Sequence, residues 1–123
     1  MSKFRALLVD DEKELMTAMV ERLGYRDVEA DYALSGAEAI EKMRNSDFDV
    51  IVIDLKMPGM SGTELIGIIK RDHPQVPVIL MTGHGFSLDG EDVPEGVVEF
   101  LPKPVNIEEL IEKMQKVIRT NGL

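Results

Sequence analysis

The sequence predicts an α/β fold in which helices cover both faces of a parallel β-sheet. Short apolar runs typical of strands alternate along the chain with segments whose apolar residues recur at helical spacing. Three of the runs, at 6–9, 50–53 and 78–81, are apolar throughout, as expected of strands that are buried on both faces of a sheet. Strands that alternate with helices are joined by crossover connections, which favour parallel pairing.

The first half of the chain contains three of the expected strands. A strand at 6–9 precedes a helix in which apolar residues recur at helical spacing over 15–23. The run at 28–32 alternates apolar and polar residues with a period of two, which indicates an edge strand. A helix at 35–44 and a strand at 50–53 follow.

The second half continues this alternation except at one segment. A helix begins near Ser61, and strands are expected at 78–81 and 97–101. A final helix over 107–118 has its apolar residues on one continuous stripe. The segment 86–96 holds two glycines, a proline and four acidic residues with little apolar periodicity. The helix needed between the last two strands is therefore expected to be short, displaced or absent.

Four expected helix starts carry a residue able to cap the first turn, followed three positions later by a glutamate that can reach back. The pairs are Asp11 with Glu14, Ser35 with Glu38, Ser61 with Glu64, and Asn106 with Glu109. The repetition of one spacing at four places supports the helix assignments.

Length and composition limit the classes of protein. The 123 residues fit one compact domain spanning 1–123, large enough to bury a core. The absence of cysteine excludes a disulfide framework, a thiol nucleophile and a thiolate zinc site, and a cytoplasmic location is the default. A formal net charge of -9 argues against direct binding to nucleic acid or to an anionic membrane. The apolar runs are also too short to span a bilayer.

Reactive polar residues stand at the ends of four expected strands. They are Asp10 and Asp11 after the first strand, Asp54 after the third, Thr82 after the fourth and Lys103 just beyond the fifth. Ligands of open parallel sheets bind beyond the carboxyl ends of the strands, so these side chains are expected to converge. Three carboxylates repel each other unless a cation offsets their charge, and oxygen ligands favour Mg²⁺. The ammonium and hydroxyl groups suit a phosphoryl ligand.

Each of these residues also fits an ordinary structural role. Asp11 can cap the first helix, and Asp10 is favoured by the same helix dipole. Asp54 and Thr82 can simply end strands, and Lys103 can be a solvated lysine. The functional interpretation depends on all of them falling at the one edge of the sheet where ligands bind.

Together these residues resemble the receiver domain of two-component response regulators, the CheY-like family. The resemblance covers essentially the whole chain and is carried by Asp10-Asp11, Asp54 followed by Met57-Pro58-Gly59, Gly62, Thr82-Gly83 and Lys103-Pro104. It implies a flavodoxin-like, doubly wound sheet of five parallel strands in the order 2-1-3-4-5, with helices on both faces.

The resemblance implies that Asp54 accepts a phosphoryl group from a phosphohistidine. Mg²⁺ would be coordinated directly by Asp11, Asp54 and the backbone carbonyl of Lys56, with Asp10 acting through water. The backbone N–H of Lys56 would also contact the phosphoryl oxygens. These roles would make the chain a Mg²⁺-dependent phosphoprotein.

The resemblance also implies how the phosphoryl group is held and detected. The backbone N–H of Gly83 would contact its oxygens, and Lys103 would pair with one of them. Thr82 would move toward the phosphoryl group, and Phe100 would follow it inward as the switch aromatic. A cis peptide bond between Lys103 and Pro104 would direct the lysine into the site.

On this interpretation the chain is a signalling domain of a phosphorelay rather than an enzyme, and it catalyses only its own phosphorylation and dephosphorylation. Its partners would be a sensor histidine kinase or a phosphotransfer protein, and a downstream effector domain or protein. Direct binding of this domain to nucleic acid or membrane is not expected, and a homodimer is left open. The weak helix signal at 86–96 predicts an output face that is mobile or has an unusual partner.

Two other classes of protein are left open. A haloacid-dehalogenase-type Mg²⁺ phosphohydrolase would use Asp10 as its nucleophile with an aspartate two positions later, where this chain has Glu12. It would also need a cap domain, for which 123 residues leave no room. A pseudo-receiver would keep the fold as an interaction module without phosphorylation. Steady turnover of an aryl phosphate would support the first class, and failure to form a hydroxylamine-labile adduct at Asp54 would support the second.

Overall fold

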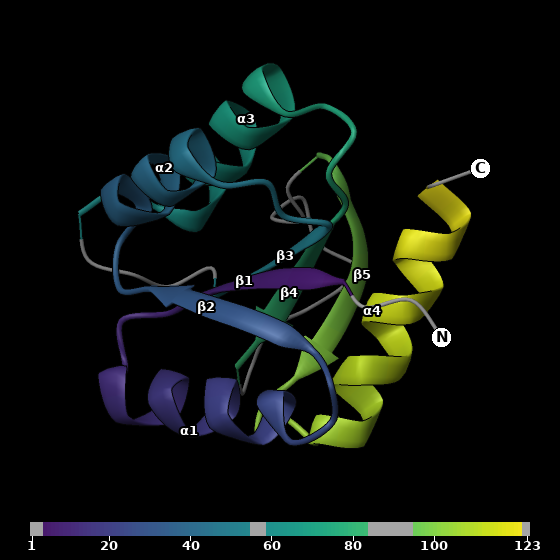
Figure 1. The fold of residues 1–123 in the computed structure, drawn as a ribbon. Coiled ribbons are helices and arrows are strands. Elements are labelled where there is room, and N and C mark those ends of the chain that lie inside the picture. The colour runs from purple at the N-terminus through teal and green to yellow at the C-terminus, as the bar shows by residue number, and fades with distance from the viewer. Residues whose placement is uncertain (1–3, 55–58, 84–94, 122–123) are drawn as a thin grey trace.

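The computed structural model of the protein describes residues 4–54, 59–83 and 95–121. In chain order its elements are β1 (Arg5–Val9), α1 (Lys13–Gly24), β2 (Glu29–Ala33), α2 (Gly36–Asn45), β3 (Val50–Asp54), α3 (Gly62–Asp72), β4 (Val78–Thr82), β5 (Val97–Pro102) and α4 (Ile107–Asn121). From β1 to β4, strands and helices alternate as the sequence predicts (Figure 1).

The strands form a parallel sheet in the order β2-β1-β3-β4-β5 (Figure 1). The central strands β1, β3 and β4 are those predicted from uninterrupted apolar runs, and every residue of β3 is buried. The edge strands β2 and β5 keep partly exposed residues. The predicted doubly wound fold with strand order 2-1-3-4-5 is therefore confirmed.

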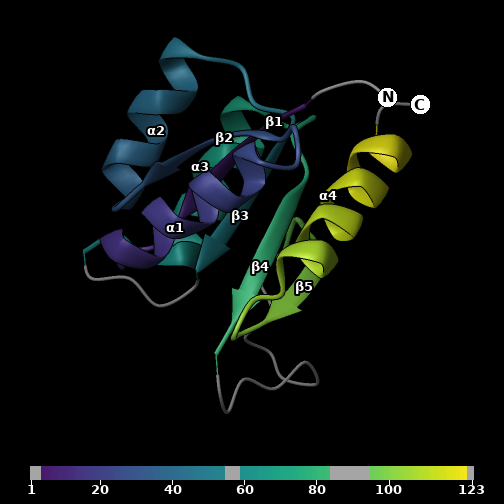
Figure 2. The ribbon, with the colours of Figure 1, turned by 60° about the horizontal axis from the view of Figure 1, so that its bottom comes forward.

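Helices cover both faces of the sheet, with α1 and α4 on one face and α2 and α3 on the other (Figure 1, Figure 2). The alternation of side chains along β1 separates two cores. Ala6 and Leu8 join the core beneath α1 and α4, whereas Leu7 and Val9 join the core beneath α2 and α3. Within the described part of the chain, no helix has the length and apolarity needed to cross a membrane.

Three of the four predicted caps are present. The hydroxyl groups of Ser35 and Ser61 each accept a hydrogen bond from the backbone N–H three residues later. At Ser61 the reciprocal bond from Glu64 completes a capping box. Asn106 Oδ1 accepts a hydrogen bond from the first turn of α4 at 3.0 Å. These bonds satisfy N–H groups that have no partner within the helix.

The prediction that Asp11 caps the first helix is wrong. Glu12 stands at the N-cap of α1, and among the described residues no side chain makes the capping hydrogen bond. Instead the Glu12 N–H donates to Asp10 Oδ1 at 3.0 Å. The carboxylate of Asp10 thus binds the N–H just ahead of the helix, and Asp11 lies exposed between them.

The connection from β4 to β5 includes residues 84–94, which lie outside the described residues. The prediction of a short, displaced or absent helix at 86–96 falls on them, apart from Glu95 and Gly96. These two residues form a turn into β5, and Gly96 has a φ of 101°, a conformation that favours glycine. The helix predicted over 107–118 is α4.

Candidate functional site

The carboxyl ends of the strands meet at one edge of the sheet, and the arrowheads of β3, β4 and β5 point to it in Figure 2. The register pairs Val9 with Ile53, Asp54 with Met81, and Thr82 with Pro102. Asp10 therefore follows β1 beside Asp54, and Lys103 follows β5 beside Thr82. The parallel register carries the residues predicted from the sequence to this edge.

Three carboxylates gather at this edge. Asp10, Asp11 and Asp54 each offer an oxygen within 4.8 Å of the others. Asp10 and Asp54 are buried, whereas Asp11 is exposed, so the cluster is accessible to solvent on the Asp11 side. Carboxylate oxygens that leave room for water are the donor set that Mg²⁺ prefers. The residues present therefore fit a magnesium site.

Lys103 is bonded to two of the three carboxylates. Its Nζ lies 2.9 Å from Asp10 Oδ2 and 3.1 Å from Asp54 Oδ2. Burial lowers the pKa of the Lys103 ammonium, but the hydrogen bonds to Asp10 and Asp54 and the negative charges of these carboxylates together raise this pKa by more, so it lies above its ordinary value of 10.5. Lys103 is therefore positively charged at neutral pH. Its charge offsets part of the negative charge that would otherwise be buried unpaired.

Backbone hydrogen bonds between strand ends hold these side chains in place. Lys103 N donates to Thr82 O at 2.8 Å, which ties the end of β5 to the end of β4. Asp10 N donates to Ala33 O at 3.1 Å, which ties the end of β1 to the end of β2. The peptide bond between Lys103 and Pro104 is cis. The site is thus built on the sheet itself.

Glu12 also belongs to this site, although the sequence interpretation gave it no role there. Its N–H binds Asp10 Oδ1, and its Oε1 lies 3.9 Å from Lys103 Nζ. The Asp10 carboxylate thus has one oxygen bound to Glu12 and the other to Lys103. The sequence signal for Glu12 was its place directly after the acidic pair.

The remaining residues predicted to act at this site are Lys56, Thr82, Gly83 and Phe100. Lys56, whose carbonyl and N–H were expected to contact the metal and the phosphoryl group, lies outside the described residues. Thr82 is half-buried at the end of β4, and Gly83 is exposed just after it. Phe100 is half-buried in β5 and packs against the core beneath α2 and α3. The roles of these residues remain predictions.

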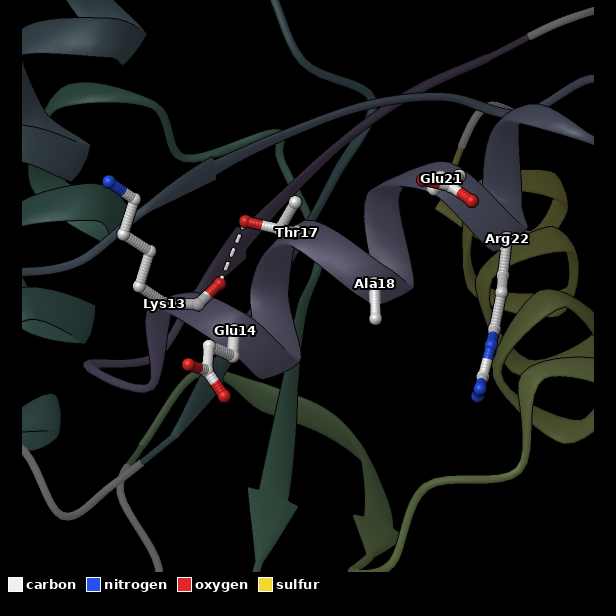
Figure 3. Close-up of a pocket in the computed structure, with 6 residues that line it drawn as sticks. All are labelled: Lys13, Glu14, Thr17, Ala18, Glu21 and Arg22. Carbon is white, nitrogen blue, oxygen red and sulfur yellow. Dashed lines mark hydrogen bonds between the residues drawn. The ribbon is translucent and has the colours of Figure 1, made fainter.

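A separate hollow of about 600 Å³ lies on the outer face of α1. Figure 3 shows Glu14 and Arg22 extending on either side of Ala18, with Thr17 hydrogen-bonded to the carbonyl of Lys13. The hollow is lined by α1 residues and holds none of the three clustered aspartates. It is therefore distinct from the carboxylate site.

A doubly wound parallel sheet with an acidic cluster and a charged lysine at its carboxyl edge defines a CheY-like signalling domain. The sequence pattern of the response regulator receiver domain matches residues 6–115. The chain belongs to this family, the receiver domains of two-component systems.

Two curated relatives are longer than this chain. The chain is 34% identical over 121 residues to the response regulator protein PilR of Pseudomonas aeruginosa, covering 97% of this chain and 27% of PilR. It is 33% identical over 113 residues to the DNA-binding transcriptional regulator NtrC of Escherichia coli, covering 90% of this chain and 24% of NtrC. The chain thus spans about a quarter of the length of these relatives.

Solved receiver domains share the fold. A CheY-like receiver domain protein from Methanospirillum hungatei superposes with a TM-score of 0.87 at 28% identity, covering 98% of both chains. The receiver domain protein from Clostridium thermocellum gives a TM-score of 0.86 at 30% identity, covering 97% of both chains. The response regulator TrrA from Thermotoga maritima, solved in complex with Mg(2+)-BeF, gives 0.80 at 33% identity, covering 93% of this chain and 98% of TrrA.

Proposed function

We propose that this chain accepts a phosphoryl group on Asp54 from a phosphohistidine, in a Mg²⁺-dependent reaction, as the receiver of a two-component or phosphorelay pathway. The observation that carries the proposal is the cluster of Asp10, Asp11 and Asp54, with the Lys103 ammonium bonded to two of its carboxylates. Membership of the receiver family supports the same assignment.

Burial favours Asp54 over Asp10 as the phosphoryl acceptor. The Asp10 side chain is fully buried. Asp54 ends β3 with 11% of its side chain exposed, so a phosphoryl donor can approach it. The same contrast opposes the hydrolase alternative, which would need Asp10 as the nucleophile.

In the proposed transfer, an Asp54 oxygen attacks the phosphorus in line with its bond to the imidazole nitrogen of the donor. A P–O bond forms, the P–N bond breaks, and the imidazole leaves with the electron pair. Mg²⁺, held by Asp11 and Asp54 directly and by Asp10 through water, would neutralise charge on the phosphoryl oxygens when bound. Lys103 would supply a second positive charge to the same oxygens.

The proposal includes a switch and partners. Thr82 would move toward the phosphoryl group and Phe100 would turn inward, which would change the surface near β5. A sensor histidine kinase or a phosphotransfer protein would supply the phosphoryl group. PilR and NtrC are much longer than this chain, which supports an effector located in another segment or another protein.

The test is incubation with acetyl phosphate and Mg²⁺, followed by intact-mass spectrometry. We expect the wild type to gain one phosphoryl group that hydroxylamine removes, and Asp54→Asn to gain none. Asp47→Asn is the matched control because Asp47 is an aspartate that lies just before β3 and outside the carboxylate cluster. It should be phosphorylated like the wild type.

Two results would contradict the proposal. An adduct that persists in Asp54→Asn would move the acceptor elsewhere, and a wild type that forms no adduct would support the pseudo-receiver. Steady release of phosphate from an aryl phosphate, abolished by Asp10→Asn, would support the hydrolase instead.

A further inference from the structure

The backbone of Phe100 is held by two charged side chains. Its N–H donates to Glu99 Oε1 at 3.2 Å, and its carbonyl accepts a hydrogen bond from Lys113 Nζ on α4. The two side chains also pair with each other, since Lys113 Nζ lies 3.6 Å from Glu99 Oε1. We refer to Glu99 and Lys113 as the Phe100 clamp.

The clamp bonds the backbone N–H and carbonyl of Phe100 on an edge strand. Among the described strands β5 lies at the edge of the sheet, and its backbone groups directed away from β4 face none of them. Glu99 and Lys113 are 21% and 25% exposed, so their bonds are less weakened by water than those of a surface ion pair.

A second lysine fixes the other oxygen of Glu99 without touching Phe100. Lys116 Nζ lies 3.2 Å from Glu99 Oε2, and its side chain is 71% exposed. Burial raises the pKa of Glu99, but the Phe100 N–H and the two ammonium groups lower it by more, so it lies below its ordinary value. Lys116 therefore offers a matched control, because it binds the same carboxylate as Lys113.

The clamp and the ring of Phe100 lie on opposite faces of the sheet. Successive side chains of a strand alternate, and Glu99 reaches toward α4 whereas the ring packs against the core beneath α2 and α3. The rotamers open to the ring depend on the backbone angles of Phe100. The clamp, on the α4 face, fixes the backbone of Phe100 and therefore restricts the rotamers of its ring on the other face.

In this structure the clamp is present together with a direct contact between Lys103 and Asp54. Lys103, three residues beyond Phe100, is bonded directly to Asp54 at 3.1 Å. A phosphoryl group on Asp54 would compete for this ammonium. The clamp is thus observed together with the arrangement that phosphorylation would have to disturb.

We propose that Glu99 and Lys113 are positioning residues that hold Phe100 in the conformation paired with the Lys103–Asp54 contact and so oppose its switch. This inference rests on the proposed function. The clamp adds to the free energy that favours the unswitched state, so a weaker clamp increases the population of the switched state. A ligand that favours the switched state then binds more tightly.

The test compares Lys113→Met with Lys116→Met, using beryllofluoride and Mg²⁺ as the probe of the phosphoryl site and NMR titration as the measurement. We expect Lys113→Met to bind beryllofluoride about fivefold more tightly than the wild type, at the lower end of typical coupling between sites. Lys116→Met should match the wild type, and Lys113→Arg should restore wild-type binding because it keeps a donor for the carbonyl of Phe100.

The direction of the change separates positioning from mere support. An ion pair that only stabilises the fold would lower the melting temperature when broken and leave the binding unchanged or weaker. Unchanged or weaker binding in Lys113→Met therefore overturns the clamp, as does tightening in Lys116→Met. A wild type that shows no response to beryllofluoride, or a response that survives in Asp54→Asn, overturns the proposed function itself and this inference with it.

Discussion

At each edge strand of the sheet, the backbone of one aromatic residue is hydrogen-bonded by an acidic side chain and a lysine. At β2 the Tyr32 N–H donates to Asp31 Oδ1 at 2.7 Å, and its carbonyl accepts from Lys42 Nζ on α2 at 2.5 Å. At β5 the corresponding group is the Phe100 clamp. Each edge has an aromatic residue, an acidic residue directly before it, and a lysine from the following helix that also pairs with the acid.

The two edges differ in the residues that lie beyond the aromatic side chain. At β2 the lysine also lies over the ring of Tyr32, 5.3 Å from its centroid, and the strand ends one residue later. At β5 the strand leads from Phe100 to Lys103, which is bonded to Asp10 and Asp54. The same arrangement of residues therefore bonds the edge strand at β2 and lies next to the carboxylate site at β5.

The largest effect is expected where β5 meets the site. Lys103→Met would leave Asp10 and Asp54 buried without their ammonium, and we expect the free energy of unfolding to fall by about 2 kcal/mol in the absence of Mg²⁺. Added Mg²⁺ should recover more stability in this variant than in the wild type. Chemical denaturation with and without Mg²⁺ measures both. Equal stability of variant and wild type without the metal would show that the ammonium does not offset the carboxylates.

The second effect concerns the cation at the same edge. At about ten times its Kd, Mg²⁺ should raise the free energy of unfolding by about 1.4 kcal/mol, because it binds the folded chain. Asp11→Ala should abolish the increase, measured as a shift in melting temperature, and Asp47→Asn, outside the cluster, should keep it. A wild-type melting temperature that ignores Mg²⁺ would count against the site.

The third prediction concerns the lysines at the two edge strands, Lys42 beside β2 and Lys113 beside β5. Lys42→Met and Lys113→Met should each lower the free energy of unfolding by about 1 kcal/mol, because each removes a charged donor from a backbone carbonyl. Thermal denaturation checks this similarity. Beryllofluoride binding should then tighten in Lys113→Met alone. Equal tightening in both variants would mean that the two edges do not differ in function.

The smallest effect is a pH dependence at β5. Because the pKa of Glu99 is lowered in the folded chain, its contribution is present above the ordinary value of 4.5 and is lost as the pH falls through the lowered pKa. We expect Glu99→Gln to be roughly 0.5 kcal/mol less stable than the wild type at pH 7 and equally stable at strongly acidic pH. Urea denaturation across this range measures the difference, and a difference independent of pH would contradict it.

The sequence predicted most of the fold because local patterns determine it. Uninterrupted apolar runs marked β1, β3 and β4, and polar alternation marked β2 as an edge strand. The acidic cluster and Lys103 could be predicted together because each residue lies at or just beyond the carboxyl end of a strand and parallel strands end at the same edge. The strand order itself came from the resemblance to the CheY-like family.

The error and the omission have different physical causes. The cap predicted at Asp11 failed because Asp10, one residue earlier, binds the Glu12 N–H. The Phe100 clamp joins Glu99 to Lys113 across the connection between β5 and α4, at a spacing that fits no local motif. Contacts of this kind depend on how the elements pack, which the sequence pattern alone does not show.

The alternation of side chains along β5 has a consequence for any protein that binds α4. A partner that contacts Lys113 acts on the Phe100 backbone from one face of the sheet, while phosphorylation would act on the ring from the other. By thermodynamic reciprocity, a partner that prefers the phosphorylated chain must by the same factor increase the phosphorylated fraction at equilibrium with its donor. A partner bound to α4 would then influence phosphorylation of Asp54 as well as respond to it.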